Sequence, residues 1–273
     1  MADRVKVSVD AGVAEVRLSR PDKMNALDGA MYEALIEAGD RLKEDRAVRA
    51  VVLSGEGEAF SAGLDGQTLK MLMGPNPGEG GQLRSPFAAA HEQRPYGIAN
   101  RVQYAVWVWH VMPVPVIAAV HGVAFGGGFQ LSLGADMRFL TADARMSIME
   151  IKWGLVPDMA GTPILASLVR DDILRELTFT GRIFSAQEAL SWGLATRICD
   201  DPRAAAFEVA HEIAARSPEA IRAAKRLLNN LSVEPAPALL AESIEQQKLI
   251  GSPNQLEAVR ANIEKRVPHF VDP

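Results

Sequence analysis

The stretch from Pro115 to Asp136 constrains this chain more than any other. It begins as an apolar run, passes through the glycine triplet Gly126-Gly127-Gly128 and continues into a predicted helix. The apolar run is typical of a buried strand. The triplet has no Cβ atoms, so a ligand oxygen can approach its peptide N–H groups at the positive end of that helix. A tight, closely packed turn explains a glycine triplet about equally well.

A second loop of the same kind favours the functional interpretation. The segment 55–65, which contains Gly55, Gly57 and Gly63, follows another apolar run at 50–53. If the two runs form neighbouring strands, each loop can give one N–H to the same ligand oxygen. Such a pair of donors is the arrangement of an oxyanion hole.

Four sequence blocks, in order along nearly the whole chain, resemble the crotonase or enoyl-CoA hydratase/isomerase superfamily. They are residues 19–27, 59–65, 115–136, and 150–158 with Thr180-Gly181-Arg182 and 186–194 beyond. The resemblance implies an α/β fold of the crotonase (ClpP/crotonase) type, a spiral of ββα units with a C-terminal helical region. It implies a core for acyl-CoA binding and catalysis at 1–202 and a helical trimerisation region at 203–273.

Composition and charge exclude several other classes of protein. The chain has 273 residues, a net charge of −5 and a single cysteine, Cys199. The negative charge argues against a nucleic-acid partner, and a lone cysteine cannot form an intrachain disulfide. No stretch has the length of a signal peptide or a membrane span, so we expect a cytoplasmic protein without membrane contact.

Hydrophobic periodicity predicts the remaining elements. Alternation at 5–9 and 13–18 predicts a hairpin, whereas the glycine- and proline-rich segment 74–86 predicts a mobile loop. The apolar segment 98–112 predicts a helix, and its Trp107 and Trp109 line an acyl pocket or simply fill the core. Further helices are expected at 28–43, 204–216, 218–230, 236–251 and 255–266.

The resemblance assigns the chemistry to two main-chain donors. It implies that the N–H groups of Leu64 and Gly127 hold the thioester carbonyl oxygen of an acyl-CoA and stabilise the enolate formed from it. Each such donor contributes roughly 2.7 to 4 kcal/mol in enzymes where it has been removed. By the same resemblance Ala62, Gly63, Asp65 and Gly126 lie against the substrate.

Two positions separate the reactions of this family. Its hydratases use two glutamates to hold and deprotonate a water, whereas this chain has Glu150 at the later position and Gln130 at the earlier one. A glutamine amide orients water but exchanges no protons near neutral pH. Losing one general acid or base lowers a rate by on the order of 100- to 10,000-fold. One carboxylate is sufficient to move a proton from C2 to C4 of a 3-enoyl-CoA, as in the family's enoyl-CoA isomerases.

Asp158 is a second candidate acid. An aspartate has this spacing from the glutamate in the dienoyl-CoA isomerases, which carry a further aspartate where this chain has Gln130. Asp158 equally suits the N-cap of a helix starting near residue 159, a position that aspartate favours. Both interpretations stay open at this stage.

The end of the chain is the predicted site of assembly and of a coenzyme A contact. Similar tails in crotonases pack across the subunits of a trimer, often paired into hexamers, so a homotrimer or hexamer is implied. The resemblance also implies that Lys265 and Phe270 contact coenzyme A, although a solvated surface explains either residue alone.

Other kinds of site find no support in the sequence. The five histidines lack zinc-motif spacing, so no metal is predicted, and no cofactor beyond the coenzyme A of the substrate. Leu131 stands where a dinucleotide-binding loop needs its third glycine, and no Gly-x-Ser-x-Gly elbow occurs. We therefore expect an enoyl-CoA isomerase. Hydration of 2-enoyl-CoA and catalytically silent acyl-CoA binding are the alternatives.

Overall fold

The computed structural model describes residues 4–68, 94–230 and 252–272, together with residues 244, 246 and 248. The predicted loop at 74–86 and most of the predicted helix at 236–251 lie outside these residues. Within them, no helix is long and apolar enough to cross a membrane.

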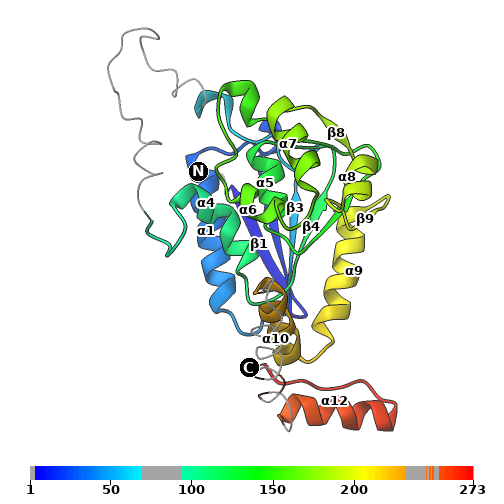
Figure 1. The fold of residues 1–273 in the computed structure, drawn as a ribbon. Helices are drawn as coiled ribbons and strands as arrows, with labels where there is room; N and C mark the ends of the chain where they lie inside the picture. Colours follow the sequence, from blue (N-terminus) through cyan, green and yellow to red (C-terminus); the bar gives the residue numbers. More distant parts are fainter. Residues whose placement is uncertain are drawn as a thin grey trace.

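A six-stranded sheet forms the centre of the molecule (Figure 1). Its first two strands pair as the predicted antiparallel hairpin, which turns at Ala11 and Gly12, and the other neighbours are parallel. In spatial order the strands are β1 (Val5–Asp10), β2 (Val13–Leu18), β3 (Ala50–Gly55), β4 (Val116–Val120), β6 (Met137–Leu140) and β9 (Arg197–Ile198).

A second, three-stranded sheet lies where the central strands end. It consists of β5 (Val123–Phe125), β7 (Arg145–Ser147) and β8 (Phe184–Ser185). Strands β4 and β6 of the central sheet are each followed at once by a strand of the second sheet, and β5 leads directly into the helix α5 (Gly127–Leu133). The predicted repetition of ββα units is therefore confirmed.

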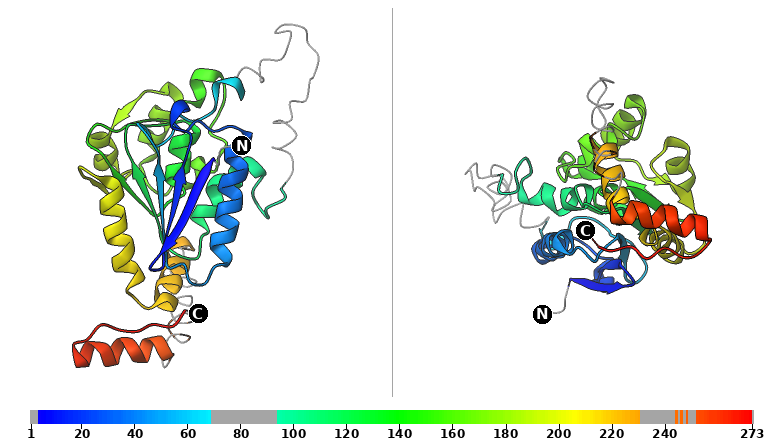
Figure 2. Two further views of the ribbon diagram at one scale, coloured as in Figure 1. Left: turned by 180° about the vertical axis from the view of Figure 1, so that it is seen from behind. Right: turned by 90° about the horizontal axis from the view of Figure 1, so that it is seen from below.

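Alternation along the central strands builds two cores. Val51, Leu53, Val116 and Ala118 face the helices α1 (Gly29–Glu44), α4 (Arg101–His110) and α5, whereas their neighbours Ala50, Val52, Ile117 and Ala119 face α9 (Pro202–Ala214). Figure 2 shows α1 and α9 on opposite sides of the sheet. A sheet covered on both faces explains why these strands are almost continuously apolar.

The helices predicted within the described ranges form, and side-chain caps set the starts of several of them. Asp28 accepts a hydrogen bond from the Met31 N–H and caps α1, and Asn100 caps α4, which therefore starts later than residue 98. The remaining elements are η1 (Pro21–Lys23), η2 (Glu150–Trp153), α6 (Gly161–Leu165), α7 (Asp171–Thr180), α8 (Ala186–Trp192), α10 (Pro218–Asn229) and α12 (Pro253–Glu264).

The C-terminal helices differ in how they join the rest. Ala206, Ala210 and Ala214 of α9 are part of the core on the second face of the sheet. Helix α12 lies beyond α10 at the end of the molecule opposite to α5 and α7 (Figure 1). Trimerisation through 203–273 stays a prediction.

A buried lysine fastens α10 to the central sheet. The Lys225 ammonium donates to the Val114 carbonyl at 2.9 Å and to Asp136 Oδ2 at 2.7 Å. The same Asp136 oxygen accepts the Val116 N–H at the start of β4, at 2.7 Å. Burial lowers the pKa of Lys225, and the Asp136 carboxylate opposes that effect. Because the charge is paired and hydrogen-bonded, the cost of burying it is offset only while both partners are present.

Asp136→Asn should therefore lower the free energy of unfolding by about 3 to 5 kcal/mol, because it leaves the buried Lys225 ammonium without its anion. The matched control is Arg216→Met, which breaks the exposed Arg216–Glu212 pair on the neighbouring helix and should cost no more than about 1 kcal/mol. Urea denaturation at one protein concentration measures both. Equal losses in the two variants would contradict a specific anchor at Lys225.

Candidate active site

Two loops leave neighbouring parallel strands and run side by side. Beyond β3, the Phe60 N–H donates to the His121 carbonyl at 2.9 Å and the Ser61 N–H to the Val123 carbonyl at 3.0 Å. Ser61 and Ala124 form a parallel bridge, which continues the pairing of β3 with β4. The predicted meeting of the two glycine-containing loops is therefore confirmed.

Gly63 brings the two predicted donors together. Its φ is +82°, and a Cβ on it would clash with the Phe125 carbonyl oxygen and lie 3.4 Å from the Gly127 nitrogen. Only glycine fits such a contact. The next amide along the chain belongs to Leu64. Among the described residues, neither the Leu64 N–H nor the Gly127 N–H has a hydrogen-bond acceptor in the protein, so both are available to a ligand.

Glu150 lies against the start of α5. It is the first residue of η2, its side chain is only 8% exposed, and a Cβ on Gly126 would lie 3.4 Å from its Oε1. Gly126 is the N-cap of α5, with φ 49° and ψ −119°. The carboxylate is therefore placed beside the backbone that carries the Gly127 donor.

Gln130 holds this carboxylate in a fixed direction. Its Oε1 accepts the N–H groups of Met159 at 2.9 Å and Gly161 at 3.0 Å, so its Nε2 must be the atom that donates to Glu150 Oε1 at 2.6 Å. A Cβ on Gly161 would lie 2.6 Å from Gln130 Oε1, so the loop can approach only because residue 161 is glycine. These contacts determine which way the amide points, and they use its carbonyl oxygen fully.

The second oxygen of Glu150 is buried without a partner among the described residues. Burial raises the pKa of Glu150, and the nearby Asp158 charge adds to the increase, while the hydrogen bond from Gln130 opposes it. A carboxylate that is buried, oriented through one oxygen and open at the other is well suited to exchange a proton.

Asp158 does not cap α6. That helix begins at Gly161, its N-cap is Ala160 in the left-handed region, and no side chain caps it. The N-cap interpretation of Asp158 is therefore wrong, because the turn at 158–160 carries the chain past the aspartate before the helix starts. Asp158 instead lines a cavity.

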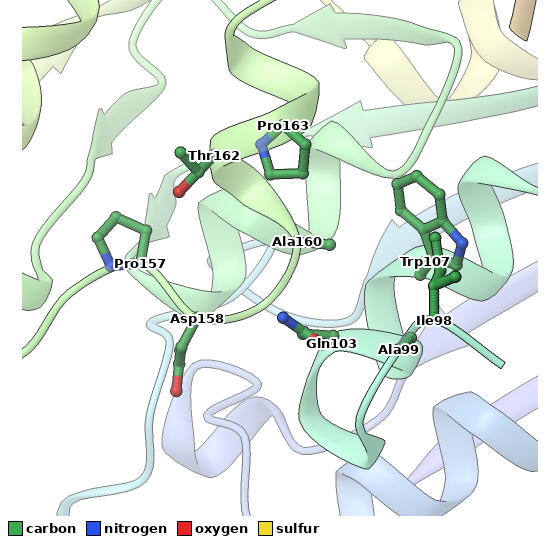
Figure 3. A pocket seen from close by; sticks show the side chains of 9 residues that line it. All are labelled: Ile98, Ala99, Gln103, Trp107, Pro157, Asp158, Ala160, Thr162 and Pro163. Atoms are coloured by element: carbon green, nitrogen blue, oxygen red, sulfur yellow. The ribbon is translucent and has the colours of Figure 1, made fainter. Parts of the chain in front are cut away.

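This cavity has a volume of about 270 Å³ and lies between α4 and the start of α6 (Figure 3). Its walls are mostly apolar, and Trp107 lines it whereas Trp109 is completely buried in the core. Trp109 therefore fills the core as the second explanation expected, whereas a role of Trp107 in an acyl pocket stays a prediction. The lining residues are Ile98, Ala99, Gln103, Trp107, Pro157, Asp158, Ala160, Thr162 and Pro163.

Tyr32 is a site residue that the sequence did not reveal. It is buried on α1, and its hydroxyl lies 3.5 Å from Met159 Sδ. Burial raises the pKa of Tyr32, and the charges of Asp158 and Glu150 raise it further. In sequence, a tyrosine at helical spacing between Met31 and Leu35 is typical of core packing.

The predicted substrate-contact residues beside Leu64 differ in what they offer. Ala62 and Gly63 form the loop itself, and the Ala62 N–H already donates to the Met24 carbonyl. The Asp65 carboxylate is buried and bound to Arg20 at 2.8 Å and to the Gln67 N–H at 2.7 Å. Burial opposes its ionisation, but these bonds outweigh burial and lower the pKa of Asp65. Its side chain therefore supports the loop and is not left open to a ligand.

Lys265 and Phe270 are not brought to this site. Lys265 is the C-cap of α12, and the Phe270 carbonyl accepts a hydrogen bond from Arg49. Both belong to the segment at the end of the molecule away from α5 (Figure 1). Within one chain they contact neither the cavity nor Glu150.

No group of three or more His, Cys, Asp or Glu side chains suited to a metal ion occurs in the described ranges. The absence of a metal stays a prediction, as does the absence of a cofactor beyond coenzyme A.

Comparison with known proteins agrees with this geometry. The sequence profile of the enoyl-CoA hydratase/isomerase family matches residues 8–273. The mitochondrial Delta(3,5)-Delta(2,4)-dienoyl-CoA isomerase of Mus musculus is 31% identical over 95% of this chain and 79% of its own length. The carnitinyl-CoA dehydratase of Proteus mirabilis is 32% identical over 99% of both chains.

Solved structures with a similar fold come from the same family. A crystal structure of an enoyl-CoA hydratase from Bacillus anthracis superimposes with a TM-score of 0.86 at 30% identity, covering 99% of this chain and all of the other. An enoyl-CoA hydratase/isomerase from Mycobacterium abscessus gives a TM-score of 0.87 at 30% identity, over 98% of this chain. The predicted crotonase-type fold is thus confirmed, and the chain belongs to the enoyl-CoA hydratase/isomerase family as an isomerase or hydratase.

Proposed function

We propose that this protein moves the double bond of an enoyl-CoA through a thioester enolate, with Glu150 as the proton carrier. The observation that carries the proposal is the environment of Gln130. Its carbonyl oxygen is taken by two backbone N–H groups and its amide donates to Glu150. The carboxylate beside the Gly126–Gly128 turn is thus that of Glu150, whose Oε2 has no partner among the described residues.

The main-chain donors supply the electrostatic part of the reaction. The N–H groups of Leu64 and Gly127 would hold the thioester oxygen, on which negative charge develops when a proton leaves C2. Donors fixed by the close approach of Gly63 to Phe125 need no rearrangement as that charge grows. Their effect is greatest in a site from which water is excluded.

Glu150 would take the proton from C2 of a 3-enoyl-CoA through its open Oε2 and return it at C4. The double bond moves from C3–C4 to C2–C3, and no proton is gained or lost overall. A raised pKa makes the Glu150 carboxylate a stronger base toward C2, and the carboxyl group that results holds its proton more tightly against loss to water until C4 accepts it.

Hydration would need a further proton-transfer group at Gln130. The Gln130 carbonyl is already occupied, so this side chain cannot accept a hydrogen bond from a water, and its amide cannot act as a base. Enoyl-CoA hydration is therefore the less favoured activity, although hydratases are among the relatives of similar fold.

Asp158 supports a second candidate, isomerisation of a dienoyl-CoA. It lines the cavity and lies close enough to raise the pKa of Glu150. A second acid at Asp158 could protonate a conjugated chain at a carbon that Glu150 alone does not reach. The similarity to a mammalian dienoyl-CoA isomerase agrees with this candidate, whereas Gln130 departs from it.

Assembly into a homotrimer or hexamer is part of the proposal. Trp153, Val156, Phe179 and Ile183 of η2, α7 and the loops after them are large apolar side chains exposed in the single chain. Lys265 and Phe270 lie away from the site of their own chain, so they could contact coenzyme A only in an assembly, where it would be bound by a neighbouring subunit. The cytoplasmic location expected from the sequence stays a prediction.

Purified protein should convert 3-enoyl-CoA to 2-enoyl-CoA and hydrate crotonyl-CoA only slowly, as followed by chromatography of the acyl-CoA products with a dienoyl-CoA in parallel. Glu150→Gln should lower isomerisation by about 100- to 10,000-fold. Asp172→Asn, which removes an exposed carboxylate paired with Arg170, is the matched control and should keep full activity. Fast hydration of crotonyl-CoA would contradict the proposal, and acyl-CoA binding without turnover in any variant would favour the silent binder.

The acid limb of the kcat/KM profile should have its midpoint above 4.5, the ordinary pKa of a glutamate, because Glu150 must be ionised to act and burial raises its pKa. The same shift predicts a stability change. The folded state binds this proton more tightly than the unfolded state, so stability falls as pH rises through the window above 4.5. Glu150→Gln should thus be at least as stable as the natural protein at neutral pH and lose that advantage in acid. Urea denaturation across pH tests this, and a less stable variant at neutral pH would be the contrary result.

Gln130→Glu should increase crotonyl-CoA hydration, by up to about 100-fold, because it supplies the missing carboxylate. One new oxygen can keep the Met159 and Gly161 N–H groups, and the other replaces Nε2 at 2.6 Å from Glu150. Two carboxylates at this distance share one proton, so the acid limb of the kcat/KM profile should also move to higher pH. Gln130→Met is the control and should reduce both reactions. If Gln130→Glu adds no hydration, the missing acid is not what limits it.

A further inference from the structure

The cavity between α4 and the start of α6 contains a polar group that the proposed chemistry does not use. Apart from Asp158, its polar lining side chains are Gln103 and Thr162, in walls otherwise made of Ile98, Ala99, Trp107, Ala160 and two prolines. Polar groups set singly into an apolar pocket are what fixes the orientation and identity of a ligand. Gln103 is the one whose direction the structure determines.

The cap of α4 fixes the Gln103 amide. Gln103 Oε1 accepts the Asn100 N–H at 2.9 Å, while Asn100 Oδ1 accepts the Gln103 N–H at 2.8 Å. This reciprocal capping box turns the carbonyl end of Gln103 toward Asn100, so the end of the amide that faces the pocket is the Nε2 group with its N–H donors. Among the described residues, Nε2 has no acceptor.

Figure 3 shows where this donor points. The Gln103 side chain enters the pocket from α4 with its nitrogen toward the side formed by Asp158 and Ala160. Asp158 and Ala160 flank Met159, whose N–H binds the Gln130 that orients Glu150. The Gln103 Nε2 group therefore lies in the same cavity as Asp158, across from the loop that holds Gln130.

The charges in the cavity restrict what can meet this donor. An N–H group facing a hydrocarbon chain loses its water and gains no partner, which is unfavourable. A carboxylate on the acyl chain would satisfy Gln103 but would be repelled by the Asp158 carboxylate in the same cavity. A neutral oxygen, either carbonyl or hydroxyl, satisfies the donor without that repulsion.

We propose that Gln103 makes this pocket select acyl groups that carry a neutral carbonyl or hydroxyl oxygen along the chain, in preference to plain hydrocarbon chains. The inference rests on the proposed function in that the cavity is taken as the acyl pocket, and it names the substrate class for that site. Gln103 is a specificity residue in this scheme and takes no part in proton transfer.

Binding of saturated acyl-CoAs by calorimetry tests the inference without any turnover. The ligands are hexanoyl-CoA, its oxo and hydroxy derivatives with the oxygen moved along the distal carbons, and adipoyl-CoA, which ends in a carboxylate. The natural protein should bind at least one oxo and one hydroxy derivative about 10-fold more tightly than hexanoyl-CoA, and adipoyl-CoA no more tightly than hexanoyl-CoA. Equal affinity for hexanoyl-CoA and every neutral oxygenated ligand would overturn the inference.

Two variants identify the group responsible. Gln103→Glu keeps an acceptor for the Asn100 N–H but replaces the donor with an oxygen, so it should lose the preference for oxo ligands. Gln103→Met should lose the preference for both oxo and hydroxy ligands and keep its affinity for hexanoyl-CoA. Glu188→Gln changes the equivalent position of the capping box on α8, away from the cavity, and should leave all preferences as they are. An oxo preference that persists in Gln103→Glu would overturn the role of this side chain.

The result is separable from the proposed function. A protein that prefers oxygenated acyl-CoA but converts no enoyl-CoA would uphold this inference and overturn isomerisation. A protein that isomerises 3-enoyl-CoA but binds all neutral acyl chains equally would uphold isomerisation and overturn this inference.

Discussion

The backbone of Gly63 lies against that of Phe125 more closely than any residue with a side chain would allow. This contact continues the pairing of β3 with β4 beyond the central sheet and brings Gly63, the residue before Leu64, close to the Gly127 nitrogen. In the described chain, neither the Leu64 N–H nor the Gly127 N–H has a protein acceptor. Glu150 lies against the same turn, because its Oε1 is 3.4 Å from the position that a Cβ on Gly126 would take. The remaining parts of the site are arranged around these close backbone contacts.

Gln130 connects Glu150 to the loop that forms part of the cavity wall. A side chain of α5 orients Glu150 with one end of its amide and holds the loop at 159–161 with the other. If residue 130 were a second glutamate, as in the family's hydratases, the same position would hold a charge next to Glu150. The glutamine keeps the geometry and removes the charge, which leaves the family's binding scaffold with a different capacity for proton transfer.

The parts of the site that sequence predicted are those encoded in short contiguous segments. Leu64, Gly127 and Glu150 each follow from a strand, a glycine turn or a motif spacing, and the hairpin, α1, α4 and the C-terminal helices follow from periodicity. Tyr32 and Gln103 were missed because each has an ordinary local explanation, as a core or helix residue, and becomes a site residue only when distant segments pack together. Asp158 was ambiguous for a similar reason, since whether it caps a helix depends on a turn of two residues. The distance of Lys265 and Phe270 from the cavity is a property of how α12 is placed, which no local pattern encodes.

The loop at 158–161 carries a further consequence. Asp158 and Ala160 form part of the cavity wall, while the N–H groups of Met159 and Gly161 donate to the side-chain carbonyl of Gln130. A molecule in the cavity therefore contacts the loop that holds Gln130, the side chain that orients Glu150. If the cavity holds the acyl chain and Glu150 carries the proton, as proposed, a chain that fits the cavity poorly would shift Glu150 and slow the chemical step as well as weaken binding.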